Sequence, residues 1–181
     1  MKILALAALA LCACAPPPLP DYGALPGFSL VAQDGAAFGS RQLAGSPWIA
    51  DFIYTSCPGP CPALTARLAS MQKALPAPVR LVSFTVDPER DTPRVLKDYA
   101  ARFGADPARW RFLTGKRSEL RALARDGFKV PVTDAGGGLV GHTLKVALVD
   151  PALRVRGYYD GDDAASMGRL ERDAAALAAA R

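Results

Sequence analysis

Two cysteines separated by three residues form the part of the sequence best suited to chemistry. Cys57 and Cys61 follow an apolar run that predicts a buried strand, and they precede a pattern that predicts a helix over about 62–75. Because proline is tolerated in the first turn of a helix, Pro60 or Pro62 marks the expected helix start. Cys57 would then lie just before the helix and Cys61 in its first turn, with both sulfurs on one side.

The N-terminal end of a helix favours a thiolate, because free N–H groups and the positive end of the helix dipole stabilise negative charge. We therefore expect the pKa of cysteines placed there to fall from about 8.5 into the range of roughly 3.5–7.5. Two such thiolates can form a disulfide, exchange with another protein's disulfide, or bind a soft metal ion. A purely structural disulfide is the alternative, but closing so short a loop contributes only about 2 kcal/mol.

The chain has one histidine, His142, which follows a glycine-rich stretch and precedes a predicted strand. A single histidine is commonly a surface or core residue without a chemical role. In a thioredoxin-like layout, however, the hairpin that begins after His142 would lie at the same end of the sheet as the cysteine helix. Two thiolates and one imidazole would make a soft, three-coordinate set suited to Cu(I), whereas a structural zinc site normally needs a fourth ligand.

Strands and helices alternate along the rest of the chain, which predicts an α/β fold. A redox motif between the first major strand and its helix makes the expected fold thioredoxin-like, with a mixed central sheet flanked by helices and an N-terminal hairpin. The helix that starts at Pro93 is expected to bury Val95. The predicted strands are a hairpin over 28–38, single strands over 48–54, 79–86 and 110–114, and a hairpin over 144–159; the other predicted helices cover 117–126 and 164–180, with a flexible loop at 134–138.

Composition limits the classes of partner. The chain has 181 residues, 50% of them hydrophobic, which suffices for one compact domain with a real core. The formal charge of +5 becomes +4 without Lys2, and the basic residues are scattered along the chain. No block of Lys and Arg with interleaved aromatic residues occurs, so nucleic-acid binding is not expected.

Residues 1–14 are expected to be a signal peptide, because the apolar segment 3–11 is too short to span a bilayer. Leu-Cys-Ala-Cys at 11–14 resembles a bacterial lipobox, which implies that Cys14 becomes the lipidated first residue. Ordinary signal cleavage nearby and a metal site formed by Cys12 and Cys14 are the alternatives. Export would place the thiols in a compartment where disulfides persist, so they would need a reducing partner.

The region after the signal peptide divides into two parts. Residues 15–26 are rich in proline and are expected to form a semi-rigid, extended spacer that holds a domain off the membrane. Residues 27–181 are expected to form the thioredoxin-like, copper-binding domain.

Three ordered motifs resemble the Sco/SenC copper chaperones. They are Tyr-Thr-Ser-Cys-Pro-Gly-Pro-Cys-Pro at 54–62, Val-Asp-Pro-Glu-Arg-Asp-Thr-Pro at 86–93, and His142-Thr143 with Leu-Val-Asp-Pro at 148–151. The resemblance covers about 28–159.

Membership of that family implies a thioredoxin-like protein tethered to the periplasmic side of the bacterial inner membrane. It also implies that residues matching Cys57, Cys61 and His142 bind copper, as Cu(I) or Cu(II). The implied role is copper delivery to the binuclear copper site of cytochrome c oxidase subunit II, or reduction of its thiols. The implied partners are subunit II or its copper donors and a periplasmic thiol reductant.

One position departs from the family pattern: Gly59 stands where the family commonly has aspartate. The change removes a negative charge beside the thiols but no ligand, so it bears on metal affinity and redox potential. Asp87 and Asp91 match the acidic loop of the family. They have two interpretations, turn and helix capping or a direct role near the metal.

Three functions compete on the sequence. The first is a copper metallochaperone for oxidase assembly, and the second is a thiol–disulfide oxidoreductase that reduces the oxidase cysteines. His142 separates these two, because a dithiol reductase has no need of an imidazole. A peroxiredoxin-like peroxidase is third, since the threonine or serine and the arginine that it needs around one cysteine cannot be placed.

Overall fold

The computed structural model describes residues 18–130, 134–135, 138–139 and 144–180. The predicted signal peptide (1–14), including Cys12 and Cys14, and the predicted metal ligand His142 lie outside the described residues.

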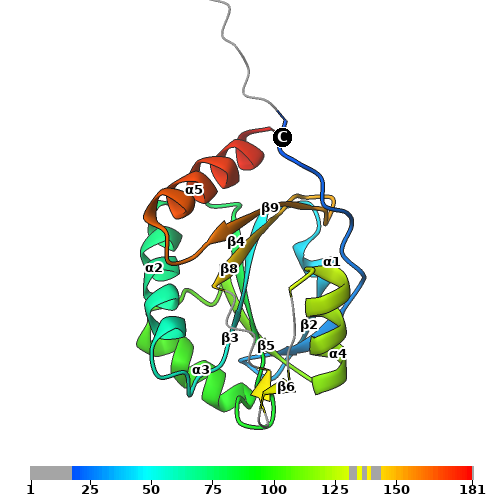
Figure 1. The fold of residues 1–181 in the computed structure, drawn as a ribbon, viewed down its shortest axis with the longest axis vertical. Coiled ribbons are helices and arrows are strands. Elements are labelled where there is room, and N and C mark those ends of the chain that lie inside the picture. The colour runs from blue at the N-terminus through cyan, green and yellow to red at the C-terminus, as the bar shows by residue number, and fades with distance from the viewer. Residues whose placement is uncertain (1–17, 131–133, 136–137, 140–143, 181) are drawn as a thin grey trace, which may run out of the picture.

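A mixed sheet forms the centre of the molecule (Figure 1). The strands are β1 (Ser29–Ala32), β2 (Ala37–Gly39), β3 (Trp48–Ile53), β4 (Arg80–Thr85), β5 (Trp110–Thr114), β6 (Asp134–Ala135), β7 (Gly138–Leu139), β8 (Lys145–Val149) and β9 (Val155–Asp160). Seven of them pair in the order β2-β1-β5-β4-β3-β8-β9, and β6 pairs with β7. In the large sheet β3, β4 and β5 are parallel and the other neighbours are antiparallel.

Helices cover both faces of this sheet. They are α1 (Ser40–Leu43), α2 (Pro60–Ala74), α3 (Pro93–Arg102), α4 (Arg117–Ala122), the π-helical turn η1 (Leu123–Gly127) that continues α4, and α5 (Ala164–Ala179). Figure 1 shows α2, α3 and α5 on one face, and α1 and α4 on the other. The predicted α/β layer with an N-terminal hairpin is therefore confirmed.

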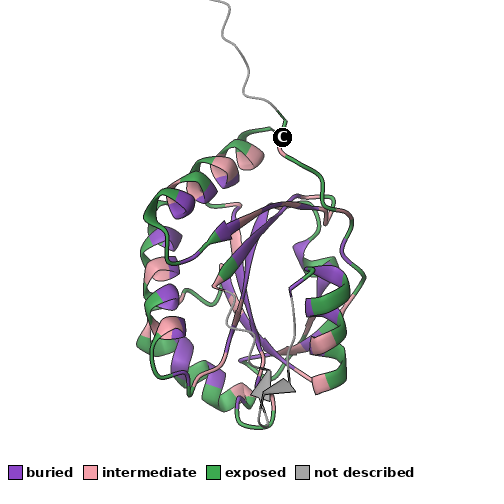
Figure 2. Ribbon diagram, in the orientation of Figure 1, coloured by how far each residue is buried: buried purple, intermediate pink, exposed green. Residues whose placement is uncertain are grey.

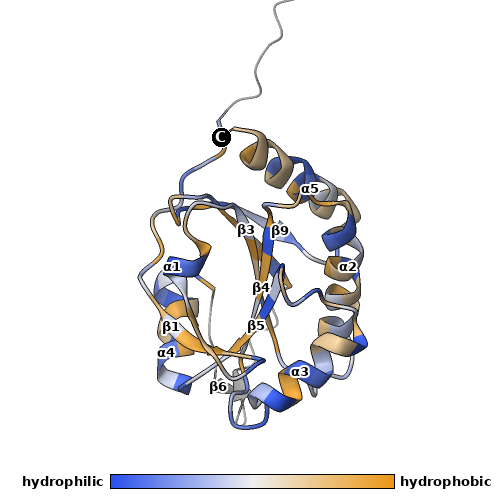
Figure 3. Cartoon of the chain, turned by 180° about the vertical axis from the view of Figure 1, so that it is seen from behind, coloured by the Kyte–Doolittle hydropathy of each residue, from blue (hydrophilic) through white to orange (hydrophobic). Residues whose placement is uncertain are grey.

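The sheet separates two hydrophobic cores because successive side chains of a strand point to opposite faces. Ile49 and Ile53 of β3 pack in the core under α2, α3 and α5, whereas Trp48 packs in the core on the other side with Phe84 of β4. The central strands are buried and the outer helix faces are exposed (Figure 2). Each helix therefore carries both hydrophobic and hydrophilic residues, while the middle of the sheet is largely hydrophobic (Figure 3).

Some local predictions were wrong. Val95 is 36% exposed rather than buried, because the buried positions of α3 are Leu96, Tyr99 and Ala100. The loop predicted over 134–138 contains the antiparallel pair β6 and β7. The predicted helix over 117–126 is confirmed, with a π-helical turn from Leu123 onward, whereas α1 had no counterpart in the prediction.

Residues 19–25, here called the N-terminal strap, run along β9. The N–H of Tyr22 donates to the carbonyl of Val155 at 2.9 Å, and the N–H of Val155 donates to the carbonyl of Gly23 at 3.0 Å. The guanidinium of Arg156 donates to two strap carbonyls at 2.7 and 2.6 Å. The strap thereby satisfies backbone groups on an edge strand that would otherwise stay unpaired.

The second half of the spacer predicted over 15–26 is thus part of the folded domain. Its prolines exclude a helix, but an extended chain can still pair with a sheet edge. The strap and the C-terminal end of α5 lie at the same end of the molecule (Figure 1).

Candidate metal and thiol site

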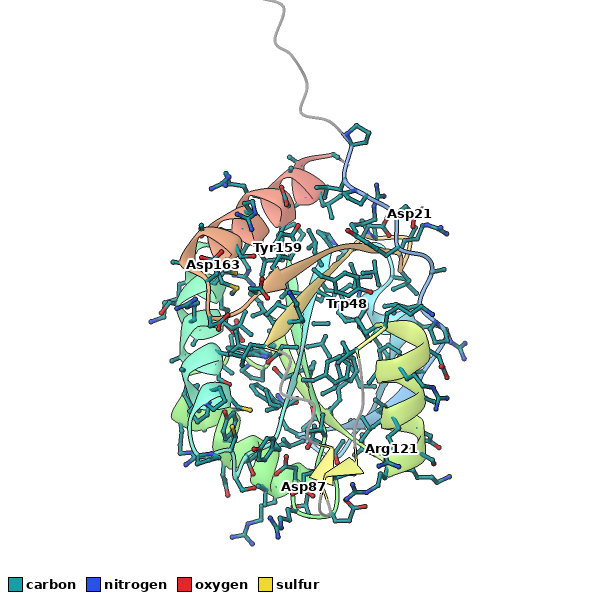
Figure 4. The ribbon with its side chains drawn as sticks, in the orientation of Figure 1. Asp21, Trp48, Asp87, Arg121, Tyr159 and Asp163 are labelled. Carbon is teal, nitrogen blue, oxygen red and sulfur yellow. The ribbon has the colours of Figure 1, made fainter. Side chains whose placement is uncertain are left out.

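The candidate site lies where two parallel strands end. β3 leads into the cysteine loop, and its neighbour β4 leads into the acidic loop that contains Asp87. Carboxyl ends of parallel strands meet at one edge of a sheet, and this edge is where ligands commonly bind in α/β folds. Figure 4 shows Asp87 at one end of the molecule and Asp21, in the N-terminal strap, at the other.

The first turn of α2 brings the two cysteines together as predicted. α2 begins at Pro60, with Gly59 as its N-cap, so Cys61 lies in the first turn. Gly59 offers no side-chain cap, and the sulfur of Cys57 accepts a hydrogen bond from the N–H of Cys61 at 3.4 Å. Both thiols are free and buried, with exposures of 5% for Cys57 and 4% for Cys61.

The pKa of Cys57 lies below its usual value. Burial alone would raise it, but hydrogen bonds from the Cys61 thiol, from the N–H groups of Gly59 and Cys61 and from the Tyr54 hydroxyl together outweigh burial. These donors stabilise the thiolate, so the expectation of a lowered pKa is confirmed for Cys57.

The same expectation is wrong for Cys61. Burial, followed by its hydrogen bond to Cys57, raises the pKa of Cys61 to about 12. The helix end stabilises one negative charge, and the second sulfur then meets both a dry environment and a neighbouring anion. Cys57 is therefore the thiol that loses its proton more readily, and Cys61 is the thiol that keeps its proton.

Asp91 braces the cysteine loop from the acidic loop. Its buried carboxylate accepts hydrogen bonds from the backbone N–H of Thr55 at 3.1 Å, from the Thr55 hydroxyl and from the Thr85 hydroxyl. Thr85 ends β4, and Thr55 stands two residues before Cys57. Of the two interpretations of Asp91, these contacts support the structural one, because its carboxylate bonds to the protein.

Asp87 holds the acidic loop itself. Its N–H donates to the Thr85 hydroxyl at 2.9 Å, and its carboxylate lies 3.8 Å from Arg90 Nε and 3.9 Å from Arg117 Nη2. Arg117, the first residue of α4, also binds the carboxylate of Glu89 in the same loop. The acidic loop is thus tied to α4 by charge.

Sequence reasoning missed Asp51, a residue of β3 that is 1% exposed. Its carboxylate Oδ1 accepts a hydrogen bond from the Ser83 hydroxyl at 2.6 Å, and burial raises its pKa to about 7. The available signal was one carboxylate in the middle of an otherwise apolar strand, Trp-Ile-Ala-Asp-Phe-Ile at 48–53.

The described residues contain neither a metal-binding cluster nor a membrane-spanning helix. No group of three or more His, Cys, Asp or Glu side chains there is arranged to hold a metal ion. None of the helices in the described part of the chain has the length and apolar character to cross a membrane.

The chain resembles proteins of known family. The SCO1/SenC family model matches residues 21–176. A SCO1 protein homolog from Bacillus subtilis is 39% identical over 161 residues, which cover 84% of this chain and 83% of the homolog.

Solved structures give the same result. A SCO1/SenC family lipoprotein from Bacillus anthracis has a TM-score of 0.79 at 34% identity, covering 86% of this chain and 95% of that one. BsSco, described as having a disulfide switch and as a member of the Sco family of cytochrome c oxidase assembly proteins, has a TM-score of 0.78 at 34% identity, covering 90% and 97%. Arabidopsis thaliana ScoI with copper bound has a TM-score of 0.72 at 26% identity, covering 86% and 98%. The predicted thioredoxin-like fold is confirmed by these likenesses.

Proposed function

The chain belongs to the SCO1/SenC family, and on this basis we propose that it is a copper metallochaperone. It binds copper through Cys57, Cys61 and His142 and helps to assemble the binuclear copper site of cytochrome c oxidase. The observation that carries the proposal is the pairing of two free thiols at the start of α2, with Cys57 just before the helix and Cys61 in its first turn. A copper-bound ScoI among the structural relatives supports copper as the cargo.

The thiols fit copper by their chemistry. Sulfur ligands select soft ions such as Cu(I), and hydrogen bonds from the Cys61 thiol and from the N–H groups at the start of α2 lower the pKa of Cys57, which favours the metal-binding thiolate. Cys61 holds its proton more strongly, so binding at both sulfurs would release a proton from Cys61. Copper would supply the charge that compensates the second thiolate.

The strand that follows His142 supports its inclusion as the third ligand. β8 is antiparallel to β3, with Ala147 opposite Ala50, so it runs beside the strand that leads into the cysteine loop. Leu144 accepts a hydrogen bond from the N–H of Gly161 at 2.7 Å, and the Gly161 carbonyl accepts one from Arg67 of α2 at 2.8 Å. The chain leaving His142 is thereby tied to the helix that contains Cys61.

A second function, thiol–disulfide exchange, is favoured by the unequal thiols. Cys57, which forms a thiolate more readily, can attack a disulfide, and Cys61 can resolve the mixed disulfide once it has lost its proton. The disulfide switch described for BsSco supports this reading. The target would be the oxidised cysteine pair of oxidase subunit II.

The location proposed for the protein is the periplasmic side of the bacterial inner membrane. Residues 1–14 would act as a signal peptide and Cys14 would carry the lipid. The lipoprotein from Bacillus anthracis supports a lipid anchor. The proposed partners are oxidase subunit II or its copper donors and a periplasmic thiol reductant.

Anaerobic copper titration of the reduced protein tests the proposal. We expect one copper per chain for the wild type and loss of binding in the Cys57→Ser, Cys61→Ser double variant. Binding that is equal in the two proteins would refute the site.

His142→Ala separates the metallochaperone from the reductase. We expect it to weaken Cu(II) more than Cu(I), since Cu(II) prefers nitrogen and oxygen ligands, and to shift the sulfur-to-copper charge-transfer band. The Cys57–Cys61 disulfide should still form in this variant. An unchanged Cu(II) affinity and spectrum would remove His142 from the site and favour the reductase.

A further inference from the structure

Three arginines line a cavity, here called the arginine cavity, at the opposite end of β4 from the acidic loop. The cavity has a volume of about 490 Å³ and lies between the β1–β2 hairpin, α1 and the starts of β4 and β5. Arg80 is the first residue of β4, and Arg109 and Arg111 stand on either side of Trp110, the first residue of β5. All three arginines are partly buried. A cavity of this size suits a small ligand.

Strand register directs two of the guanidinium groups to one face of the sheet. Arg111 lies opposite Val82 in the parallel pairing of β4 and β5, and Arg80 stands two residues before Val82. Val82 packs in the core on the side of α1 and α4. Because side chains alternate along a strand, Arg80 and Arg111 point to that same side.

The charge of Arg111 is already compensated. Among the described residues that line the arginine cavity, Asp34 is the one acidic side chain. Its Oδ2 accepts a hydrogen bond from Arg111 Nη1 at 2.7 Å, and its Oδ1 accepts one from the N–H of Ala36 at 3.0 Å. The Arg111 guanidinium also lies 5.6 Å from the centre of the Phe38 ring. Asp34 is therefore occupied and does not neutralise the other two arginines.

Arg80 and Arg109 form no ion pair with a carboxylate in the described part of the chain. Arg80 Nη1 donates to the carbonyl of Gln42 on α1. Arg109 Nη2 donates to three backbone carbonyls between the end of α2 and the start of β4, at 2.9 to 3.2 Å, and Arg109 Nε is buried without a hydrogen-bond partner among the described residues. These carbonyls fix the two guanidinium groups in place and leave both positive charges uncompensated.

The lining of the arginine cavity combines positive charge with an apolar wall. Three arginines and one aspartate give it a net charge of +2, which favours an anionic ligand. Guanidinium groups match the oxygens of phosphate, to which they donate paired hydrogen bonds. Phe38, Leu43 and several alanines form the rest of the lining, so the cavity also has an apolar surface for an organic group.

We propose that the arginine cavity binds a phosphate ester, with Arg80 and Arg109 donating to the phosphate oxygens and the apolar wall contacting the organic group. A soluble phosphate ester and the headgroup of an anionic phospholipid share this chemistry. The inference is independent of the copper and thiol proposals, because the cavity and the acidic loop lie at opposite ends of β4.

The arginine cavity and the N-terminal strap lie at the same end of the sheet. Trp48 of β3 pairs with Arg80 on one side and with Val149 of β8 on the other. Val149 in turn pairs with Val155, to which the strap is hydrogen-bonded. A lipid on Cys14, as proposed above, would hold this end of the molecule near the phospholipid headgroups.

Calorimetric titration of the metal-free full chain with sn-glycerol 3-phosphate, at low ionic strength, tests the site. We expect one binding site in the wild type and an affinity at least about tenfold weaker in Arg80→Gln, because a charge-assisted contact is lost. Asp34→Asn should bind the ester more tightly than the wild type, since it removes the negative charge from the cavity and frees Arg111. A gain in affinity cannot result from misfolding.

Arg94→Gln is the matched control, because Arg94 is an exposed arginine of α3 outside the cavity. It removes the same charge and should leave the affinity within about twofold, since solvent and salt screen a distant exposed charge. Thermal unfolding of each variant confirms that it is folded.

Three results would overturn the inference. The first is a wild type that does not bind the ester, or an Arg80→Gln variant that binds it equally well. The second is an equal loss of affinity in Arg80→Gln and Arg94→Gln, which would mean that net charge alone attracts the ester. The third is succinate binding to the wild type as tightly as glycerol 3-phosphate, which would exclude selection of phosphate.

Vesicle sedimentation separates the two sources of the phosphate. The full chain is mixed with vesicles of phosphatidylglycerol or of phosphatidylcholine, and the predicted signal peptide is present in both the wild type and Arg80→Gln. A smaller bound fraction of Arg80→Gln on phosphatidylglycerol alone would assign the site to a lipid headgroup. Equal bound fractions on both lipids, together with the loss of glycerol 3-phosphate binding, would assign it to a soluble ester.

Discussion

The Asp91 carboxylate accepts hydrogen bonds from both the backbone N–H and the hydroxyl of Thr55, two residues before Cys57. The side chain of Asp91, in the acidic loop, therefore helps to fix the position of Thr55 in the cysteine loop. This arrangement resembles the outer shell of a metal site, in which hydrogen bonds orient the residues that bind the ion.

Asp91→Asn should destabilise the fold and loosen the cysteine loop. An asparagine places an NH2 group against the donors of Thr55 and Thr85, so about 2–3 kcal/mol of unfolding free energy should be lost. Urea unfolding measures the loss. Asp106→Asn is the control, because the exposed Asp106 accepts one hydrogen bond from the N–H of Ala108 at 2.9 Å. Equal losses in the two variants would contradict the bracing role.

Gly59→Asp should make Cys57 less reactive. A Cβ at Gly59 meets no atom within 4 Å, so the larger side chain is sterically accommodated. The new carboxylate would disfavour the Cys57 thiolate by about 1 kcal/mol, which raises its pKa and slows alkylation by iodoacetamide at pH 7 several-fold. Gly59→Asn supplies the same shape without charge. If both variants reacted at the same rate, the electrostatic explanation would fail.

Asp51→Asn should stabilise the protein increasingly as pH rises. The pKa of Asp51 is raised from 3.8 to about 7 in the folded state, so folded protein holds a proton there that unfolded protein has released. Wild-type stability should therefore fall between pH 4 and pH 7, by up to roughly 4 kcal/mol from this group. The difference from Asp51→Asn, measured by urea unfolding, should be small at pH 4 and largest above pH 7. A difference independent of pH would contradict the raised pKa.

Arg156→Ala should release the N-terminal strap. Its guanidinium binds two strap carbonyls and lies 3.0 Å from Asp150, whose side chain is 8% exposed. Removing it leaves a buried carboxylate without its cation, and we expect a loss of about 3 kcal/mol with faster amide exchange in 19–25. Arg154→Ala breaks a more exposed pair with Asp21 and should cost much less stability, because solvent screens exposed ion pairs. Equal effects would contradict this difference.

The local features of the site could be predicted from the sequence because they depend on neighbours in the chain. Proline at the start of α2 and a spacing of four residues determine where Cys57 and Cys61 stand. The alternation of strands with helices likewise predicted the layers of the fold. The position of His142 stays a prediction from its motif.

The supporting contacts could not be predicted because their partners are distant in sequence. Asp91 and Thr55 are 36 residues apart, and Asp51 and Ser83 are 32 apart. The strap is the extreme case, since Arg156 binds a carbonyl 137 residues away. Composition predicted an extended segment there, but only the tertiary fold provides the sheet edge on which it lies.

The docked strap also limits how far a lipid-anchored protein could reach. With lipid on Cys14, only residues 15–18 would separate the anchor from the strap, a span of at most about 14 Å. The strap lies at one end of the molecule and the acidic loop at the other (Figure 4). The cysteine loop would then lie the length of β3, about 20 Å, from the anchored end of the molecule. A membrane-bound client would then have to reach the end of the molecule that is farthest from the anchor, and the strap determines which end that is.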